Sequence, residues 1–146
     1  MLTFEQIEYH PYLLTHLTPV LEIHKKHSIV TAAYGPLSPI LRHPDGGPIK
    51  PILERIAKRL STETGEDIDA AAVLLLWTRA MGVVAVGASG NPGRIKGLAR
   101  VSKMPDLRME DMDEITEAGK KIHFRAYSEH MVVDFPAPDL PEKYPA

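Results

Sequence analysis

The sequence predicts an α/β fold built from parallel βαβ units. Short apolar segments alternate along the chain with segments of helical periodicity, and this order is typical of parallel strands joined by helices. With 146 residues, 44% of them hydrophobic, the chain has the size and composition of one globular domain. Its 13 prolines are nearly twice the usual share, and several of them mark the boundaries of predicted elements.

Three segments have the pattern of short strands, at residues 2–8, 28–34 and 83–86. The first alternates apolar and polar residues and stops before His10 and Pro11. The other two are continuous apolar runs, which are typical of strands buried on both faces of a parallel sheet.

Five segments carry helical periodicity or helix-start signals. The predicted helices begin near Pro19, Pro51, Asp67 or Asp69, Pro92 and Glu110, and they end near His27, Gly65, Gly82, Leu98 and Ile122. Thr18 and Asn91 precede a proline, so each is a predicted N-cap followed by proline at the first helical position. The segment 35–49 is rich in proline and glycine and is predicted to be a long loop.

Composition excludes several classes of protein. The net charge of −2 carries no electrostatic footprint for nucleic acid or an anionic membrane, and the absence of cysteine excludes disulfides and thiol catalysis. No secretory signal and no apolar stretch of membrane-spanning length is present, so we expect a cytoplasmic protein. We expect a main domain at residues 1–134 and a Pro-rich tail at 135–146 that lies on the surface or lacks regular structure.

Three strands form a small sheet for a parallel fold. Such a sheet needs cover on both faces and leaves two edges open to further pairing. The apolar runs look like central strands of something larger, while the chain begins directly on its first strand. We therefore expect the chain to be the C-terminal portion of a longer α/β domain.

Five segments in this order support a resemblance to a known family. They read QIEYHPYL, AAYGPLSP, PILERIA, AAAVLLLW and GASGNPGRIK. Together they closely resemble the aldo-keto reductase superfamily over residues 5 to about 130, and the later segment MEDMDEITEAGKKIHFRAYSEHM is most similar to the fungal ketone and keto-amide reductase branch. The resemblance implies the C-terminal portion, about three strands plus helices, of a (β/α)₈ TIM barrel that uses NADP(H) to reduce small-molecule aldehydes and ketones.

The resemblance also implies that the catalytic residues lie elsewhere. The family carries its catalytic Asp, Tyr, Lys and His on the first four strands, so no catalytic residue is expected in this chain, which would be inactive alone. An alternative is a non-catalytic module that self-associates through its strand edges or pairs with another barrel fragment. A third possibility is an incomplete product of a gene for a normal barrel.

Four predicted cofactor-binding residues belong to the first two strands and the loop after them. An aromatic ring at the carboxyl end of a barrel strand faces the active site and can stack on a flat heterocycle, which makes Tyr34 a candidate. The resemblance implies that Tyr34 stacks on the nicotinamide and that Gln6 holds its carboxamide. It further implies that Gly35 and Leu37 lie near the pyrophosphate, although the family usually has a serine in place of Gly35.

Three more candidates lie in the segment GASGNPGR. Ser89, Asn91 and Arg94 surround a turn from a strand into a helix N-terminus, where free N–H groups and the helix dipole favour a phosphate. Arg94 adds a bidentate partner and favours NADPH over NADH. The alternative is an ordinary strand–helix turn with a surface arginine. The family commonly has a lysine at Ala88, so we expect weaker binding of the adenosine end.

The sequence predicts no metal site. His24 and His27 are three residues apart with Glu22 nearby, but no third ligand has a standard spacing, and a polar helix face is the simpler interpretation. The acidic run at residues 110–114 is predicted to be the solvated start of a helix, where negative charge complements the helix dipole.

Overall fold

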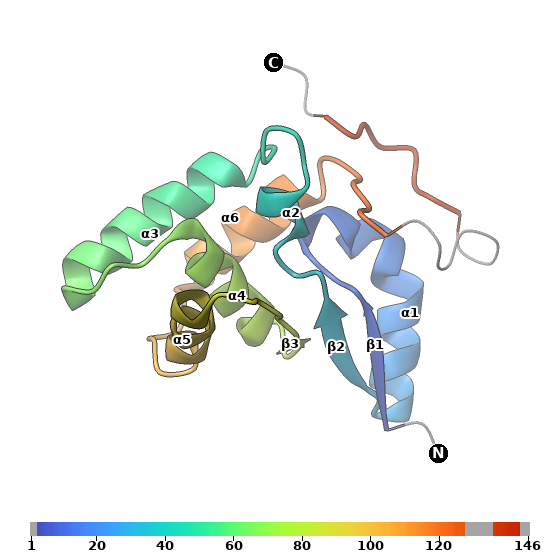
Figure 1. Ribbon diagram of the computed structural model, residues 1–146. Coiled ribbons are helices and arrows are strands. Elements are labelled where there is room, and N and C mark those ends of the chain that lie inside the picture. The colour runs from blue at the N-terminus through green and yellow to red at the C-terminus, as the bar shows by residue number, and fades with distance from the viewer. Residues whose placement is uncertain (1–2, 128–135, 144–146) are drawn as a thin grey trace.

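The computed structural model describes residues 3–127 and 136–143 and has an α/β architecture around one parallel sheet (Figure 1). Its strands are β1 (Phe4–Glu8), β2 (Val30–Tyr34) and β3 (Val84–Ala85), and they lie side by side in that order. Both strand pairs are parallel, so the carboxyl ends of all three strands meet at one edge of the sheet. The predicted fold class is confirmed.

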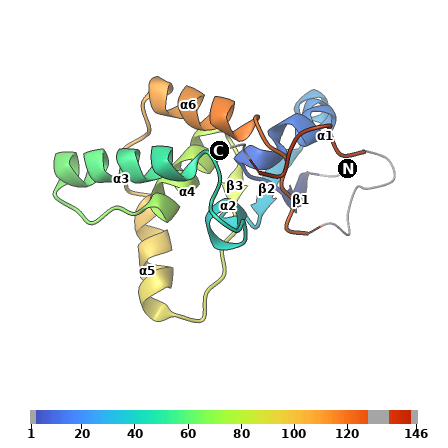
Figure 2. The same ribbon diagram turned by 90° about the horizontal axis from the view of Figure 1, so that it is seen from above.

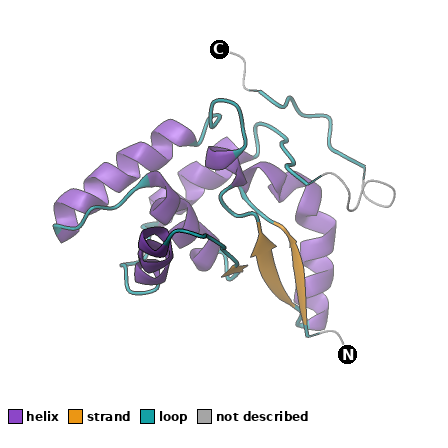
Figure 3. Cartoon of the chain, viewed as in Figure 1, coloured by secondary structure: helices purple, strands orange, loops and turns teal. Residues whose placement is uncertain are grey.

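The described residues form six α-helices and one short 3₁₀ helix, which Figure 3 shows around the small sheet. They are η1 (Pro11–Leu13), α1 (Leu14–His27), α2 (Ser38–Leu41), α3 (Lys50–Thr64), α4 (Ala70–Ala80), α5 (Pro92–Val101) and α6 (Met109–Gly119). Among these helices, none combines the length and apolar character needed to cross a membrane.

Local capping chemistry sets the helix ends where the sequence signals were strong. Asp69 Oδ1 accepts a hydrogen bond of 2.8 Å from Ala72 N and starts α4, while the side chain of Asn91 caps α5. Gly65 ends α3 with φ of 72°, in the left-handed region that glycine adopts at little cost. Residues 72–78 of α4 are all buried, as its nearly continuous apolar sequence predicts.

The predicted start of α1 is wrong. The helix begins at Leu14, and Thr18 Oγ1 donates a hydrogen bond of 3.0 Å to Leu14 O instead of capping a new helix. Pro19 lies inside the helix, where its missing N–H costs one backbone hydrogen bond. Leu14 and Leu17 are buried in the core, and this burial explains why the helix extends over the earlier residues.

The predicted long loop and two element ends also differ from the structure. The segment 35–49 contains α2 and a turn anchored by Tyr12, whose hydroxyl donates to Gly46 O at 2.5 Å and accepts from Ile49 N at 3.2 Å. The second strand starts at Val30 and not at Ser28, because Ser28 takes φ of 54° and ends α1. Helix α6 ends at Gly119, three residues before the predicted end.

One face of the sheet is packed against helices, and the other is only partly covered. Ile7, Thr31 and Ala33 are buried on the packed side, where α1 lies beside β2 and α4 beside β3.

On the other face, Phe4 and Val84 remain 56% and 54% exposed, whereas Ala32 and Glu8 are buried. The expectation of burial on both faces therefore holds at the centre of β2 and is wrong for β3, whose two residues are exposed.

The described part of the Pro-rich tail follows the surface. Residues 136–143 form no helix or strand and run beside the segment after α6 (Figure 1). The His123 N–H donates to Pro141 O at 2.9 Å, and His43 Nε2 donates to Glu142 O at 3.0 Å. These contacts agree with the predicted irregular tail on the surface.

Candidate functional site

Gln6 and Tyr34 lie on the same face of the sheet. Gln6 pairs in register with Ala32, and Tyr34 follows Ala32 by two residues, so both side chains point to one side of neighbouring strands. Tyr34 ends β2 with 45% of its surface exposed, and Gln6 is exposed in the middle of β1. The structure therefore brings these two predicted residues together near the carboxyl edge of the sheet.

Gly35 and Leu37 form the turn that follows Tyr34. Gly35 has φ of 58°, and its carbonyl accepts a hydrogen bond of 3.0 Å from Ser38 N. A Cβ atom at Gly35 would lie 2.8 Å from Ser38 Oγ and 2.9 Å from Tyr127 Cε2, so a side chain at this position would force these neighbours to shift. Leu37 is half-buried and precedes α2. The serine that the family usually has at Gly35 would displace them in the same way.

Ser89, Asn91 and Arg94 form a closed capping turn at the start of α5. Ser89 Oγ accepts from Asn91 N at 3.1 Å, and Asn91 Oδ1 accepts from Gly93 N at 2.8 Å and Arg94 N at 3.2 Å. These N–H groups are therefore engaged, contrary to the expectation that they are free for a phosphate. A phosphate at this turn would have to displace the Asn91 cap or bind the Arg94 side chain.

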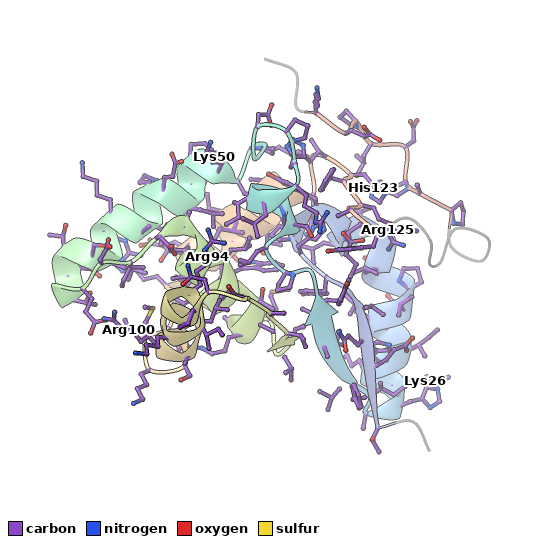
Figure 4. All side chains as sticks on the ribbon, in the orientation of Figure 1. Lys26, Lys50, Arg94, Arg100, His123 and Arg125 are labelled. Carbon is purple, nitrogen blue, oxygen red and sulfur yellow. The ribbon has the colours of Figure 1, made fainter. Side chains whose placement is uncertain are left out.

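The Arg94 guanidinium is available for such a contact. Arg94 is exposed, and within the ranges 3–127 and 136–143 no carboxylate forms an ion pair with it. Figure 4 labels it at α5. Seen from above in Figure 2, α2 and the loop before α5 project toward the same side of the chain. The predicted loop residues before α2 and those at the start of α5 thus lie on one side of the chain, whereas Gln6 and Tyr34 lie on the strands.

A buried carboxylate that the sequence interpretation missed lies opposite Tyr34. Glu8 ends β1 and pairs in register with Tyr34. Glu8 Oε1 accepts from Ala126 N at 2.8 Å and from His10 Nε2 at 3.1 Å, and Oε2 accepts from Tyr127 N at 3.1 Å. Burial raises the pKa of Glu8, but these hydrogen bonds outweigh it and lower the pKa. The available signal was a charged residue at the end of a predicted strand.

Tyr127 covers part of Tyr34. Their ring centroids are 4.7 Å apart with an interplanar angle of 62°, which is an edge-to-face contact. The Arg42 guanidinium lies 5.2 Å from the centroid of the Tyr127 ring, a cation–π distance. The segment after α6 therefore contributes an aromatic ring to the candidate site, although it is remote from Tyr34 in the sequence.

Several other polar side chains in the described residues have structural roles. Tyr9, His10 and Tyr12 are buried. His24 bonds Thr31 Oγ1 at 2.8 Å and Glu5 Oε2 at 2.9 Å. In the part of the chain that the structure describes, no group of three His, Cys, Asp or Glu residues is arranged to hold a metal ion.

The acidic run at the start of α6 is only partly solvated. Asp111 is buried, contrary to the prediction, because its Oδ2 accepts from Arg108 N at 3.1 Å and pairs with Arg59 at 2.5 Å. The charge of Asp111 therefore stabilises the contact between α3 and α6 as well as the start of α6.

The chain was compared with family models, curated proteins and solved structures. No family model matches the chain. The chain is 29% identical over 126 residues to the NAD/NADP-dependent indole-3-acetaldehyde reductase of Schizosaccharomyces pombe, across 86% of the chain and 42% of that enzyme. It is 31% identical over 114 residues to the NADPH-dependent alpha-keto amide reductase of Saccharomyces cerevisiae, across 78% of the chain and 35% of that enzyme.

Solved structures show the same similarity in three dimensions. An aldo/keto reductase from Brucella melitensis matches 79% of the chain with a TM-score of 0.59 and 27% identity, over 38% of its own length. A structure of a Gox0644 variant in complex with NADPH matches 80% of the chain with a TM-score of 0.64 and 26% identity, also over 38% of its length.

The fold is thus that of a portion of a parallel βα barrel, the class of protein that holds its ligands at the carboxyl ends of the strands. The chain shares both sequence and fold with the aldo-keto reductase superfamily, and the predicted resemblance is confirmed. It spans 35% to 42% of the length of the curated relatives that it matches.

Proposed function

We propose that the chain is the C-terminal, cofactor-binding part of an NADPH-dependent aldo-keto reductase that reduces aldehydes and ketones to alcohols. The observation that carries this proposal is the exposed pair of Gln6 and Tyr34 on one face, at the carboxyl edge of a parallel sheet. The names of the curated relatives, an aldehyde reductase and a keto-amide reductase, support the same class of reaction.

The side chains present fit a nicotinamide dinucleotide. The Gln6 carboxamide is exposed and can exchange two hydrogen bonds with the nicotinamide carboxamide, while the Tyr34 ring offers a flat apolar surface. The loop at Gly35 and Leu37 adjoins this ring and can approach the pyrophosphate through its backbone. Arg94, without an ion-pair partner in the described residues, suits the 2′-phosphate of NADP(H).

When bound, the reduced nicotinamide supplies a hydride to a carbonyl carbon of a small-molecule substrate. The role of this chain is to hold and orient the ring through Gln6 and Tyr34, and to hold the phosphates near Ser89, Asn91 and Arg94. The family resemblance implies that the groups that donate the proton lie on strands that this chain does not supply, so the chain alone is expected to bind cofactor without turnover. A main domain at residues 1–134, a tail at 135–146 and a cytoplasmic location complete the proposal.

Calorimetric titration of the purified chain with NADPH tests this function. We expect Tyr34→Ala and Gln6→Ala to weaken binding, while Val30→Ala, at the opposite end of the same strand face, serves as the matched control. A parallel assay follows NADPH absorbance with an aldehyde and a ketone, and turnover above the blank would contradict the expected inactivity. Absence of NADPH binding by the native chain would refute the cofactor-binding role.

The exposed apolar residues on one face of the sheet support a second candidate function, a non-catalytic module that self-associates or pairs with another barrel fragment. Parallel sheets are covered on both faces, whereas Phe4, Val30 and Val84 are about half exposed here. Light scattering after size-exclusion chromatography distinguishes the two states. A discrete dimer that Val84→Lys dissociates would support self-association, and a monomer at every concentration tested would contradict it.

A further inference from the structure

Glu8 fixes the position of the segment that follows α6. Its carboxylate is buried at the end of β1 and accepts hydrogen bonds from two successive backbone N–H groups, those of Ala126 and Tyr127, at 2.8 and 3.1 Å. The ring of His10, itself fully buried, donates to the same carboxylate. A carboxylate with several such donors sets the geometry of its partners closely, because charge-assisted hydrogen bonds are short and strong.

The bond from Tyr127 N to Glu8 places the Tyr127 ring against Tyr34. Glu8 and Tyr34 are register partners on one face of the sheet, so a backbone held by Glu8 reaches the ring of Tyr34 directly. The two rings then meet edge to face, with 4.7 Å between their centroids. The Tyr127 ring also lies beside Gly35 and under the guanidinium of Arg42.

Gly35 makes this contact possible. A Cβ atom at this position would lie 2.9 Å from Tyr127 Cε2, closer than real Cβ atoms approach, so any larger residue would move the ring. The family usually has a serine at this position. In this chain the residue is Gly35, and the Tyr127 ring fills the space that a serine side chain would take. Tyr34 is supported by this contact and still keeps 45% of its surface exposed.

We propose that Tyr127 is a buttress that fixes the Tyr34 ring for stacking on a planar heterocycle, and that Glu8 is the positioning residue that holds Tyr127 in place. The proposal rests on the proposed function, because it takes the nicotinamide as the planar ring. A preorganised ring loses less freedom when a ligand stacks on it, so the buttress contributes affinity for the ring part of the cofactor and none for its phosphates.

The test compares two ligands on the full chain, NADPH and 2′-phospho-ADP-ribose, which carries the phosphates but no nicotinamide. We expect Tyr127→Ala to weaken NADPH binding about two- to tenfold, as for loss of one aromatic contact, and to leave the affinity for 2′-phospho-ADP-ribose unchanged. Tyr127→Phe should bind NADPH as the native chain does, because the contact uses the ring. Glu8→Gln should weaken NADPH binding in the same selective way.

Hydrogen exchange gives a readout of the positioning step that needs no ligand. The amides of Ala126 and Tyr127 should exchange slowly in the native chain and faster in Glu8→Gln, because the neutral amide has one acceptor oxygen for two N–H donors. Equal losses for both ligands would show a general structural role and overturn the proposal, and so would unchanged NADPH binding by Tyr127→Ala. If the native chain binds neither ligand, the proposed function fails first, and the role of Tyr127 in it fails with it.

Discussion

A methyl group added at Gly35 is expected to destabilise the chain more than the same group added at Gly65. Both glycines have positive φ, 58° and 72°, so Gly35→Ala and Gly65→Ala place a Cβ atom on a left-handed backbone at about the same cost. That cost is about 1 to 2 kcal/mol. The two positions differ in their surroundings, because nothing lies within 4 Å of the added atom at Gly65.

At Gly35 the added atom meets two neighbours below 3.0 Å. The Ser38 hydroxyl can rotate away, whereas the rigid Tyr127 ring has to shift as a whole. Losing the edge-to-face contact with Tyr34 adds about 0.5 to 1.5 kcal/mol. The expected loss of unfolding free energy is therefore about 1.5 to 3.5 kcal/mol for Gly35→Ala, against about 1 to 2 kcal/mol for Gly65→Ala.

Urea unfolding followed by circular dichroism measures both losses on the same scale. The comparison uses the midpoints of transitions with equal m-values, since a changed m-value would report a different unfolded state. The double variant Gly35→Ala/Tyr127→Ala should lose less than the sum of its two single variants, because the clash with Tyr127 is already absent. Equal losses at Gly35 and Gly65, or strict additivity in the double variant, would refute the reasoning.

Three further predictions concern the cap of α4, the core and pH. Asp69→Ala should lower the free energy of unfolding by about 1 kcal/mol, as measured by urea unfolding, because Ala72 N loses its acceptor. Leu53→Ala should cost about 2 to 5 kcal/mol by the same measurement, while Leu41→Ala should cost little, because Leu53 is 0% and Leu41 72% exposed. Burial lowers the pKa of His10 and His123. Below about pH 6.5 the unfolded chain therefore binds protons at these two histidines more readily than the folded chain does. Stability measured by thermal unfolding should therefore be full above that pH and fall as the pH decreases below it; constant stability down to pH 5 would contradict this expectation.

Local chemistry made several elements predictable from the sequence. The carboxylate at Asp69 and the amide at Asn91 satisfy N–H groups of their own helices, and Gly65 needs only its own backbone freedom, so these signals act within a few residues. The start of α1 was not predictable in this way, because burial of Leu14 and Leu17 in the core outweighs the local signal at Pro19.

The candidate site likewise contains residues that local sequence signals predict and residues that depend on long-range contacts. Tyr34 at the end of an apolar strand and Gln6 on its neighbour follow from strand pattern and family resemblance. The contact between Tyr127 and Tyr34 could not be predicted from strand pattern or family resemblance, because no periodicity or motif links the two residues. Their contact depends on Glu8, which binds the backbone of a segment more than a hundred residues away in the chain. A long-range hydrogen bond of this kind leaves no pattern in the sequence around either partner.

The exposed apolar residues on one face of the sheet have a consequence for how this chain behaves at different concentrations. Phe4, Val30 and Val84 expose apolar surface that a bound partner would remove from water. Anything that binds only the folded form stabilises it by mass action, so the melting temperature would then rise with the concentration of the covering chain. A melting temperature that is the same in dilute and concentrated solution would mean that this surface stays in water.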